Sequence, residues 1–287
     1  MNPSLHSPAK INLFLEILRR RADGYHTLDS VFQEISLGDR LRATPRRDGR
    51  VVLSCDDPSL PVDERNLVRR AADAWTAARG PVGVTFRLTK RIPVGAGLGG
   101  GSGNAATALR ALNALSRARA PVRALARIAR GLGADVPFFL RGGLARAGGV
   151  GEVLTPLPTR RRRPLWFVLV FPRVFSSTAE AYRALRFPLT ARRSCLKLTR
   201  ALRAGEPPRL WASWLFNRLE EVVVPRLGPV AETKRALIAA GALTALMSGS
   251  GSSVFGPVDD AAHGRRVKAA LPRSVGDVWL VRSVDRP

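Results

Sequence analysis

The stretch Pro93-Val94-Gly95-Ala96-Gly97-Leu98-Gly99-Gly100-Gly101-Ser102-Gly103-Asn104 decides the fold. The apolar run 82–89 before it predicts a strand, and the residues from about Gly103 to Leu115 have the period of an amphipathic helix. Six glycines in nine residues let backbone N–H groups approach a ligand without obstruction by Cβ atoms. The positive end of the helix dipole adds to this effect, so the segment is predicted to cradle an anion, most simply a phosphate group.

Two familiar phosphate motifs do not describe this loop. It lacks the Lys-Ser/Thr pair that ends a G-x-x-x-x-G-K-[ST] loop, and no acidic residue follows at the distance typical of a dinucleotide-binding fingerprint. A flexible glycine hinge is the simpler alternative. It leaves unexplained why a helix begins directly after the glycines.

The residues around this loop predict a mixed first domain. The turn Arg21-Ala22-Asp23-Gly24 joins two β-rich runs, 11–17 and 25–36, which predict a hairpin. A further strand is expected over 51–54, and helices are expected over 66–78 and 122–131.

A second domain is predicted after Leu157, where a polar, arginine-rich stretch interrupts the pattern. We therefore place domain boundaries at 1–157 and 158–287. Strand-like runs alternate there with helix-like runs, which favours an α/β sandwich with a mostly antiparallel sheet, and so an α+β fold for the whole chain. The strand-like runs are 165–171, 243–247, 253–255 and 278–281, and the helix-like runs are 178–185, 230–240 and 259–270.

Three further segments carry groups suited to phosphoryl chemistry. Lys10 and Asn12 open an apolar strand, and Asp135 follows Gly133 and precedes the apolar, strand-like run 136–140. Phosphoryl transfer to an alcohol needs a base for the hydroxyl proton, cations for the developing charge and a phosphate cradle. A surface lysine and a helix-capping aspartate are the plain alternatives. The glycine-serine segment 247–253 fits a tight hairpin as well as a ligand loop.

The chain has a formal net charge of +25, carried mostly by arginine. Such a charge suits nucleic acid, a membrane surface or small anions, and codon bias with arginines spread over solvated faces is the plainer explanation. The densest run, Arg160 to Arg163, is predicted to be a solvated loop before a strand and lacks the interleaved aromatic residues of a nucleic-acid platform. We expect no nucleic-acid partner and no membrane partner, while the oligomeric state stays open.

The two isolated cysteines, Cys55 and Cys195, have neither disulfide-framework nor zinc-site spacing, which favours the reducing cytosol. No run approaches the roughly 18 apolar residues of a membrane span, and no apolar signal core opens the chain. A cytoplasmic location is the expectation.

Taken together, these segments resemble the GHMP kinase superfamily. The resemblance is carried, in order along most of the chain, by 8–13, 21–28, 66–68, 97–107, 133–137 and 247–251. The segment Asp23-Gly24-Tyr25-His26 is more specific than the glycine loop. It resembles the members that phosphorylate a cytidylated methylerythritol in the non-mevalonate route to isoprenoid precursors.

The resemblance implies an N-terminal domain like ribosomal protein S5 domain 2 and a ferredoxin-like C-terminal domain. It also implies transfer of the γ-phosphoryl group of ATP, with Mg²⁺, to the 2-hydroxyl of the methylerythritol unit. Asp135 would be the base and Lys10 its charged partner. The substrate would contact Asn12, Tyr25, His26, Thr178 and Tyr182, the two tyrosines enclosing the cytosine. The ATP site would be formed by Asn66, Lys90, Pro93, Gly95, Gly97, Leu98, Gly99, Gly100, Gly101, Ser102, Gly103 and Asn104.

One departure and two alternatives accompany this interpretation. Relatives often have a second serine where this chain has Gly103, so a hydroxyl contact to metal or phosphate is missing there. A kinase for another alcohol, such as mevalonate or homoserine, is the nearest alternative, although neither substrate offers a base for Tyr25 to stack on. An RNA-binding protein with a degenerate kinase fold is the alternative from another class.

Overall fold

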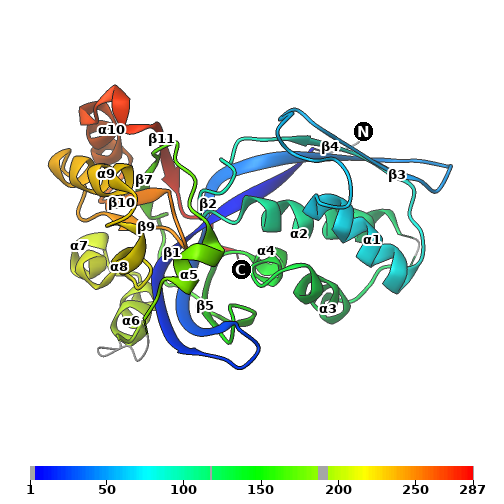
Figure 1. The fold of residues 1–287 in the computed structure, drawn as a ribbon, viewed down its shortest axis with the longest axis horizontal. Helices are drawn as coiled ribbons and strands as arrows, with labels where there is room; N and C mark the ends of the chain where they lie inside the picture. The colour runs from blue at the N-terminus through cyan, green and yellow to red at the C-terminus, as the bar shows by residue number, and fades with distance from the viewer. Residues whose placement is uncertain (1–3, 117, 187–192, 287) are drawn as a thin grey trace. The chain divides into compact units, whose positions relative to one another are not determined.

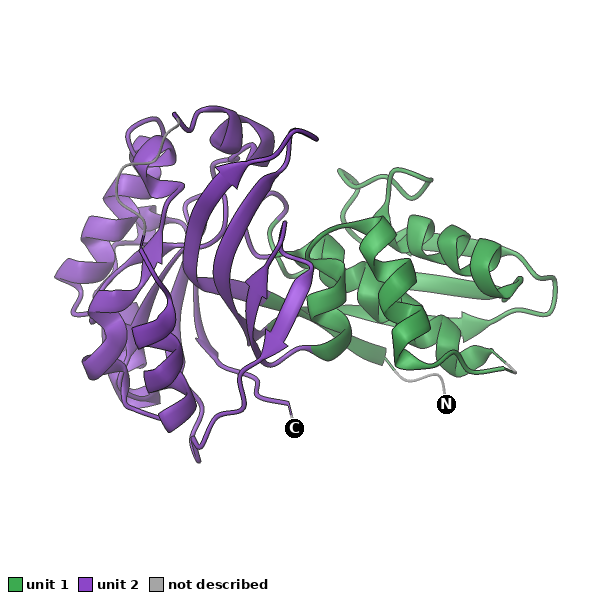
Figure 2. Cartoon of the chain, turned by 90° about the horizontal axis from the view of Figure 1, so that it is seen from below, with its two compact units in different colours: residues 1–9, 37–93, 99–141 green, residues 10–36, 94–98, 142–287 purple. Residues whose placement is uncertain are grey.

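The computed structural model describes residues 4–116, 118–186 and 193–286. It divides into two compact units that are discontinuous along the chain (Figure 2). Unit 1 contains residues up to 9, 37–93 and 99–141, and unit 2 contains 10–36, 94–98 and 142 onward. The boundary predicted between residues 157 and 158 falls inside unit 2, and it stays a prediction.

Two long strands contribute residues to both units. They are β1 (Ser4–Arg20) and β2 (His26–Pro45), neighbours in one sheet and joined by the predicted turn. Both are longer than the runs that predicted them. Residues 7–10 of β1 are buried on both faces and so lack an alternation of polar and apolar side chains, and in β2 the buried Asp39 interrupts the apolar face. In β1, every residue from Ser7 to Ile17 is buried.

Unit 1 is a helical layer on a small sheet (Figure 1). The end of β2 pairs antiparallel with β4 (Val84–Thr89), and β3 (Val51–Cys55) pairs parallel with β4. A parallel pair needs a crossover, which α1 (Leu67–Arg79) supplies. The other helices are α2 (Gly100–Leu115), α3 (Val122–Leu132) and α4 (Val136–Arg141).

The helix α2 is the centre of this layer, since it packs against α1, α3 and α4. Small buried residues such as Ala105 and Ala108 allow these close approaches, and the indole of Trp75 from α1 fills the core. The prediction of a strand-like run after Asp135 is wrong, because residues 136–141 form the helix α4. In a short run of apolar residues, periodicity cannot distinguish a buried helix from a buried strand.

Unit 2 contains an antiparallel sheet in the order β11-β7-β10-β9, as the mostly antiparallel prediction requires. Its strands are β7 (Trp166–Phe171), β9 (Leu246–Met247), β10 (Val254–Val258) and β11 (Asp277–Arg282). Two helices, α9 (Gly228–Ala239) and α10 (Ala261–Ala270), pack on this sheet. Shorter helices complete the unit: α5 (Thr178–Arg183), α6 (Leu196–Ala204), α7 (Pro208–Trp211), α8 (Glu220–Val223) and the 3₁₀ turns η1 (Ala212–Trp214) and η2 (Arg273–Val275).

The parts of β1 and β2 in unit 2 carry three short strands that the sequence patterns did not predict. They are β5 (Leu144–Gly148), which pairs with β2, β6 (Val153–Pro156), which pairs with β5, and β8 (Phe216–Asn217), which pairs parallel with β1. Strands of two to five residues are too short to show a recognisable alternation of polar and apolar side chains.

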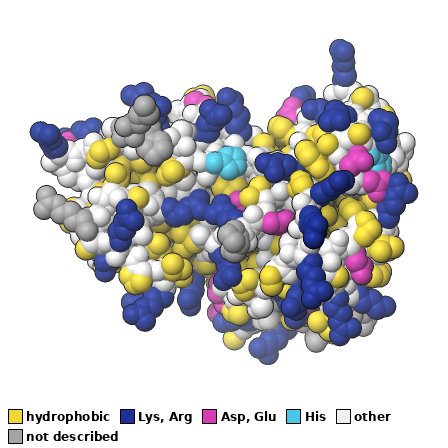
Figure 3. Space-filling model, turned by 180° about the vertical axis from the view of Figure 1, so that it is seen from behind, with side chains coloured by type: hydrophobic (Ala, Val, Ile, Leu, Met, Phe, Trp, Pro, Cys, Tyr) yellow, Lys and Arg dark blue, Asp and Glu magenta, His cyan; other side chains and the backbone are white. Residues whose placement is uncertain are grey.

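Basic side chains are scattered in many groups over the face seen in Figure 3. The loop of Arg160 to Arg163 precedes β7, as predicted. The prediction that the whole loop is solvated is wrong for Arg161, whose side chain is only 4 % exposed. No helix in the described ranges is both long and apolar enough to cross a membrane.

Candidate functional site

Lys10 brings a buried positive charge to β1. The residue is 4 % exposed, and its Nζ donates to Asn12 Oδ1 at 2.7 Å and to the Gly97 carbonyl at 3.3 Å. The Nζ also lies 5.2 Å from the centre of the Phe32 ring, a cation–π distance. Lys10 and Asn12 are two residues apart on a strand, so their side chains share one face. The structure therefore joins Lys10, Asn12 and the glycine-rich loop, as the sequence predicted.

Asn12 is held by partners of its own. Its Nδ2 donates to Ser30 Oγ at 3.0 Å, and Ser30 Oγ donates to the Phe14 carbonyl at 2.5 Å. Because the amide nitrogen is occupied in this way, Asn12 turns its oxygen to the Lys10 ammonium. Ser30, on β2, thus orients the pair, although nothing in its local sequence distinguishes it from another strand serine.

The glycine-rich loop contacts the second glycine-serine segment. Ser248 Oγ donates to the Gly97 carbonyl at 3.1 Å, and the backbone N–H of Ser253 donates to the Ala96 carbonyl at 3.2 Å. Gly97 has φ +74°, and a Cβ atom there would lie 2.1 Å from the Ser248 carbonyl oxygen. Only glycine fits this position. The segment 247–253 joins the antiparallel strands β9 and β10 as a hairpin and packs on the loop as well.

Asn217 fixes that hairpin and was missed by sequence reasoning. Its Nδ2 donates to the carbonyls of Met247 at 2.8 Å and Gly249 at 2.7 Å, and its Oδ1 accepts from the Leu219 N–H at 3.0 Å. Asn217 is 1 % exposed and lies on the two-residue strand β8. A lone asparagine without a surrounding pattern offers nothing for sequence analysis to find.

In unit 1, a buried carboxylate organises the approach to the glycine-rich loop. Asp39 is fully buried, and its Oδ1 accepts from the N–H groups of Arg91 at 2.7 Å and Ile92 at 2.8 Å. Its Oδ2 pairs with Lys90 Nζ and accepts from Asn104 Nδ2 at 2.9 Å. The predicted ATP-site residues Lys90 and Asn104 are therefore brought together, and Asp39 is the residue that joins them.

The second half of the loop is the first turn of α2. The helix begins at Gly100, three residues earlier than predicted, and its N-cap residue Gly99 is left-handed at φ +70°. No side chain caps this end, so the first N–H groups of the helix remain available to an anion. Gly103 faces the Pro8 carbonyl, which a Cβ atom would approach to 2.6 Å. Ser102 is half-buried in the same turn.

Two other predicted residues of unit 1 lie at helix starts. Asn66 is the N-cap of α1, where its Oδ1 accepts from the Val68 N–H at 2.9 Å and its Nδ2 donates to the Pro61 carbonyl at 2.7 Å. Asp135 is half-buried and directly precedes α4. Lys10 belongs to unit 2 and Asp135 to unit 1, so their cooperation stays a prediction.

The predicted aromatic residues lie in unit 2. The rings of His26 and Tyr182 are 5.1 Å apart and tilted by 36°, whereas Tyr25 is 64 % exposed. Burial, with a smaller contribution from the charge of Arg20, lowers the pKa of His26 below its ordinary 6.5. The imidazole is therefore neutral at pH 7 and offers one donor and one acceptor. Thr178 begins α5, and its hydroxyl pairs with Ser250 Oγ at 2.7 Å.

Comparisons with known proteins agree with one another. Residues 66–143 match the model of the GHMP kinases N-terminal domain, and residues 199–277 match that of the GHMP kinases C-terminal domain. The chain is 43 % identical to the 4-diphosphocytidyl-2-C-methyl-D-erythritol kinase of Pelotomaculum thermopropionicum, covering 96 % of each chain. It is 41 % identical to the kinase of the same name from Geobacter metallireducens, covering 98 % of this chain and 97 % of that one.

Solved structures give the same result. The chain superimposes with a TM-score of 0.81 on a crystal structure of 4-(cytidine 5'-diphospho)-2C-methyl-D-erythritol kinase, at 38 % identity, covering 98 % of this chain and 99 % of that one. A homoserine kinase from Cytophaga hutchinsonii matches with a TM-score of 0.73 at 20 % identity, covering 99 % of both chains. That second likeness shows the fold alone.

Proposed function

Since the chain belongs to the 4-diphosphocytidyl-2-C-methyl-D-erythritol kinase family, within the GHMP kinases, we propose that it transfers the γ-phosphoryl group of ATP to the 2-hydroxyl of that cytidylated substrate. The reaction would serve the non-mevalonate route to isoprenoid precursors. The observation that carries the proposal is the buried Lys10 ammonium, hydrogen-bonded to Asn12 and to the Gly97 carbonyl of the glycine-rich loop.

The chain's residues divide the chemical work. Asp135 accepts the proton of the 2-hydroxyl as that oxygen bonds to the γ-phosphorus, and the bond to the ADP oxygen breaks. Lys10 stabilises the negative charge that develops on the transferring group. Asn12 orients the hydroxyl. These assignments rest on residue type and on the position of each residue in the family's motifs.

The phosphates are held by the backbone of the glycine-rich loop and by the start of α2. Two observations support this assignment. The N-terminus of α2 has no side-chain cap, and Gly97 and Gly99 adopt the left-handed conformations that glycine tolerates. Lys90 and Asn66 line the nucleotide pocket in this proposal. Asp39 keeps Lys90 and Asn104 in place through its two carboxylate oxygens.

Mg²⁺ is the proposed metal. No group of three or more His, Cys, Asp or Glu side chains in the described part of the chain is arranged to hold a metal ion. The ion would be bound mainly by ATP phosphates and water, because Mg²⁺ in kinases is held by few protein groups. Its contribution would be to neutralise charge on the phosphates.

Cytosine recognition is assigned to the pair of His26 and Tyr182, with Tyr25 closing from the exposed turn. An aromatic ring face stacks on a base, and a neutral imidazole reads the polar edge of the base by hydrogen bonds. Mevalonate and homoserine have no base, so these rings favour the cytidylated substrate. A cytosolic location and the absence of a nucleic-acid partner stay predictions.

The proposal is tested by measuring ADP release with the cytidylated substrate, mevalonate and homoserine as acceptors. We expect turnover with the first and at least 100-fold lower kcat/KM with the others, since stacking contributes about 1–3 kcal/mol per ring and each 1.4 kcal/mol is tenfold. Equal rates with all three acceptors would assign the chain to another branch of the superfamily. Filter binding to RNA that weakens steeply with salt, without turnover, would support the RNA-binding alternative.

The rings have a separate test. Tyr182→Ala should raise KM for the cytidylated substrate by about 5- to 150-fold, and Tyr182→Phe should retain most of the affinity because the ring face makes the contact. KM for ATP serves as the internal control and should hardly change. A parallel rise in both constants would remove Tyr182 from substrate recognition.

A further inference from the structure

A cavity of about 250 Å³ lies in unit 2 beside the loop that precedes β7 and the segment that follows β11. It is lined by Arg161, Arg162, Arg163, Pro164, Arg282, Ser283, Val284 and Asp285. Four arginines and one aspartate give this lining a formal net charge of +3. None of these residues belongs to the candidate phosphoryl-transfer site.

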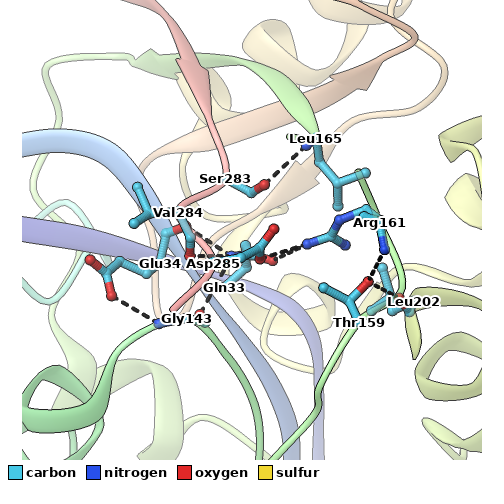
Figure 4. Close-up of polar contacts among 10 residues, drawn as sticks. All are labelled: Gln33, Glu34, Gly143, Thr159, Arg161, Leu165, Leu202, Ser283, Val284 and Asp285. Atoms are coloured by element: carbon cyan, nitrogen blue, oxygen red, sulfur yellow. Dashed lines mark hydrogen bonds and ion pairs between the residues drawn. The ribbon is translucent and has the colours of Figure 1, made fainter. Parts of the chain in front are cut away.

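Arg161 is the buried charge of this lining. Its side chain is 4 % exposed, and one Nη donates to Asp285 Oδ1 at 2.7 Å and to Gln33 Oε1 at 3.5 Å (Figure 4). Its Nε and its other Nη are buried and have no hydrogen-bond partner among the described residues. Burying guanidinium N–H groups without an acceptor is costly, so one carboxylate leaves this group's charge and donors incompletely compensated.

The other three arginines are exposed and free to close on a ligand. In the part of the chain that the structure describes, Arg162, Arg163 and Arg282 form no ion pair with an acidic side chain. Guanidinium groups gathered in this way repel one another. Their repulsion falls when an anion binds between them, and the cavity is therefore electrostatically biased toward an anionic ligand.

The walls of the cavity are fixed in advance. Ser283 Oγ accepts from the Leu165 N–H at 3.0 Å, and the Ser283 N–H donates to the Leu165 carbonyl at 2.8 Å (Figure 4). Thr159 Oγ1 accepts from the Arg161 N–H at 3.2 Å and donates to the Leu202 carbonyl at 2.8 Å. The Ser283 bonds hold the two lining segments together, and the Thr159 bonds fix the segment of Arg161 on α6, so little backbone order has to be gained when a ligand binds.

From the buried Arg161 and the three unpaired arginines around one cavity, we propose that this cavity is a binding site for a compact phosphate-type oxyanion. Inorganic phosphate, inorganic diphosphate and the diphosphate group of a small metabolite share the chemistry it would recognise. Arginine suits them because its planar donors match phosphate oxygens two at a time. At about 250 Å³ the cavity is smaller than the ~300–1,000 Å³ of pockets for drug-sized ligands, so its volume suits a compact anion.

Calorimetric titration of the full chain tests the proposal. The glycine-rich loop is first saturated with a non-hydrolysable ATP analogue, and inorganic phosphate, inorganic diphosphate and methyl diphosphate are then titrated separately. We expect one site, tighter for diphosphate than for phosphate. If methyl diphosphate binds as tightly as inorganic diphosphate, the natural ligand is the diphosphate group of a metabolite. If methyl diphosphate does not bind, the natural ligand is the free ion.

The variant Arg162→Gln/Arg282→Gln removes two cavity charges from exposed positions, where folding tolerates the change. It should weaken diphosphate binding at least tenfold, because charge-assisted hydrogen bonds are the strong ones. The matched control is Arg160→Gln/Arg203→Gln, which removes two exposed charges from residues that do not line the cavity. The control should bind like the parent chain, and thermal melting should show that both variants fold.

Three results would overturn the proposal. They are the absence of binding in the presence of the ATP analogue, equal weakening in both double variants, and unchanged binding in the cavity variant. A single-stranded RNA oligomer provides the comparison with nucleic acid. Binding of RNA that displaces diphosphate and weakens equally in both double variants would show a diffuse charge effect and contradict a built site.

Discussion

Lys10 and Asp39 show how single buried charges position backbone in this protein. Lys10 donates to the Gly97 carbonyl, and Asp39 accepts from the N–H groups of Arg91 and Ile92. Both charged groups act on the segment that contains the glycine-rich loop. Their hydrogen bonds satisfy backbone groups that a loop of glycines could not satisfy through its own side chains.

Asp135→Asn is predicted to lower kcat by about 100-fold or more, because general-base catalysis contributes 10²–10⁴-fold. Asparagine preserves the shape of the side chain but cannot accept the hydroxyl proton. Stopped-time ADP assays give kcat, and calorimetry gives ATP affinity, which should be nearly unchanged. Near-normal kcat would leave Asp135 with only a structural role at the start of α4.

His26 is predicted to titrate below 6.5 in the folded protein, because burial and then the charge of Arg20 lower its pKa. The unfolded chain then binds more protons at pH values just below 6.5, so stability falls as the pH decreases through this range. NMR titration of the imidazole gives the pKa directly. Arg20→Gln should raise it by part of the shift, and an unchanged pKa in that variant would exclude the charge effect.

At the scale of elements, the contact between the glycine-rich loop and the hairpin of β9 and β10 depends on the absence of a side chain at Gly97. Gly97→Ala is predicted to weaken ATP binding by at least about tenfold, because a left-handed conformation costs a non-glycine residue ~1–2 kcal/mol before the clash with the Ser248 carbonyl is added. Calorimetry measures the affinity.

The control is Gly131→Ala in α3, where a Cβ atom meets nothing within 4 Å. It should retain ATP affinity and gain at most ~1 kcal/mol of stability, since alanine is favoured over glycine in a helix and Gly131 lies in the last turn of α3. If Gly97→Ala bound ATP like the parent chain, the loop would not require its observed conformation.

The elements that sequence patterns predicted well are those with a clear period or a specific turn. The helices α1 and α3 and the helix after the glycine-rich loop are examples, confirmed to within a few residues. The hairpin of β1 and β2 is also confirmed, with strands that extend well beyond the predicted runs. The helix α4 was misread because Val136 to Leu140 is uniformly apolar. The strands β5, β6 and β8 are defined by their long-range partners rather than by local pattern.

The candidate site divides in the same way. Glycine spacing and motif order identified Lys10, Asn12 and the loop, and the structure joins them. The supporting residues Ser30, Asp39 and Asn217 escaped notice because each acts through a hydrogen bond to a residue distant in sequence. Such partners become visible only when the chain is folded.

For the molecule as a whole, basic residues far outnumber acidic ones and give a net charge of +25. The buried acidic residues that pair with arginine are therefore expected to contribute most to stability among the ion pairs. Glu16 is fully buried and accepts two hydrogen bonds of 2.7 Å from Arg218, one at Oε1 and one at Oε2. Glu16→Gln is predicted to lower the free energy of unfolding by about 3 kcal/mol, the low end for breaking a buried pair, because Glu221 still pairs with Arg218.

The measurement is denaturant unfolding followed by circular dichroism. Asp73→Asn is the control, since it removes an exposed pair with Arg69 on α1 and should cost less than about 1 kcal/mol. Equal losses in the two variants would show that the buried pair contributes no more to stability than a surface pair.

The most direct measurement of the central claim follows the phosphoryl group itself. The protein is incubated with the cytidylated methylerythritol and ATP that carries ¹⁸O on its γ-phosphate, and the products are analysed by ³¹P NMR and mass spectrometry. We predict a new phosphomonoester on the 2-hydroxyl that contains the three labelled oxygens, formed in step with ADP. Labelled inorganic phosphate with unchanged substrate would contradict phosphoryl transfer to this alcohol.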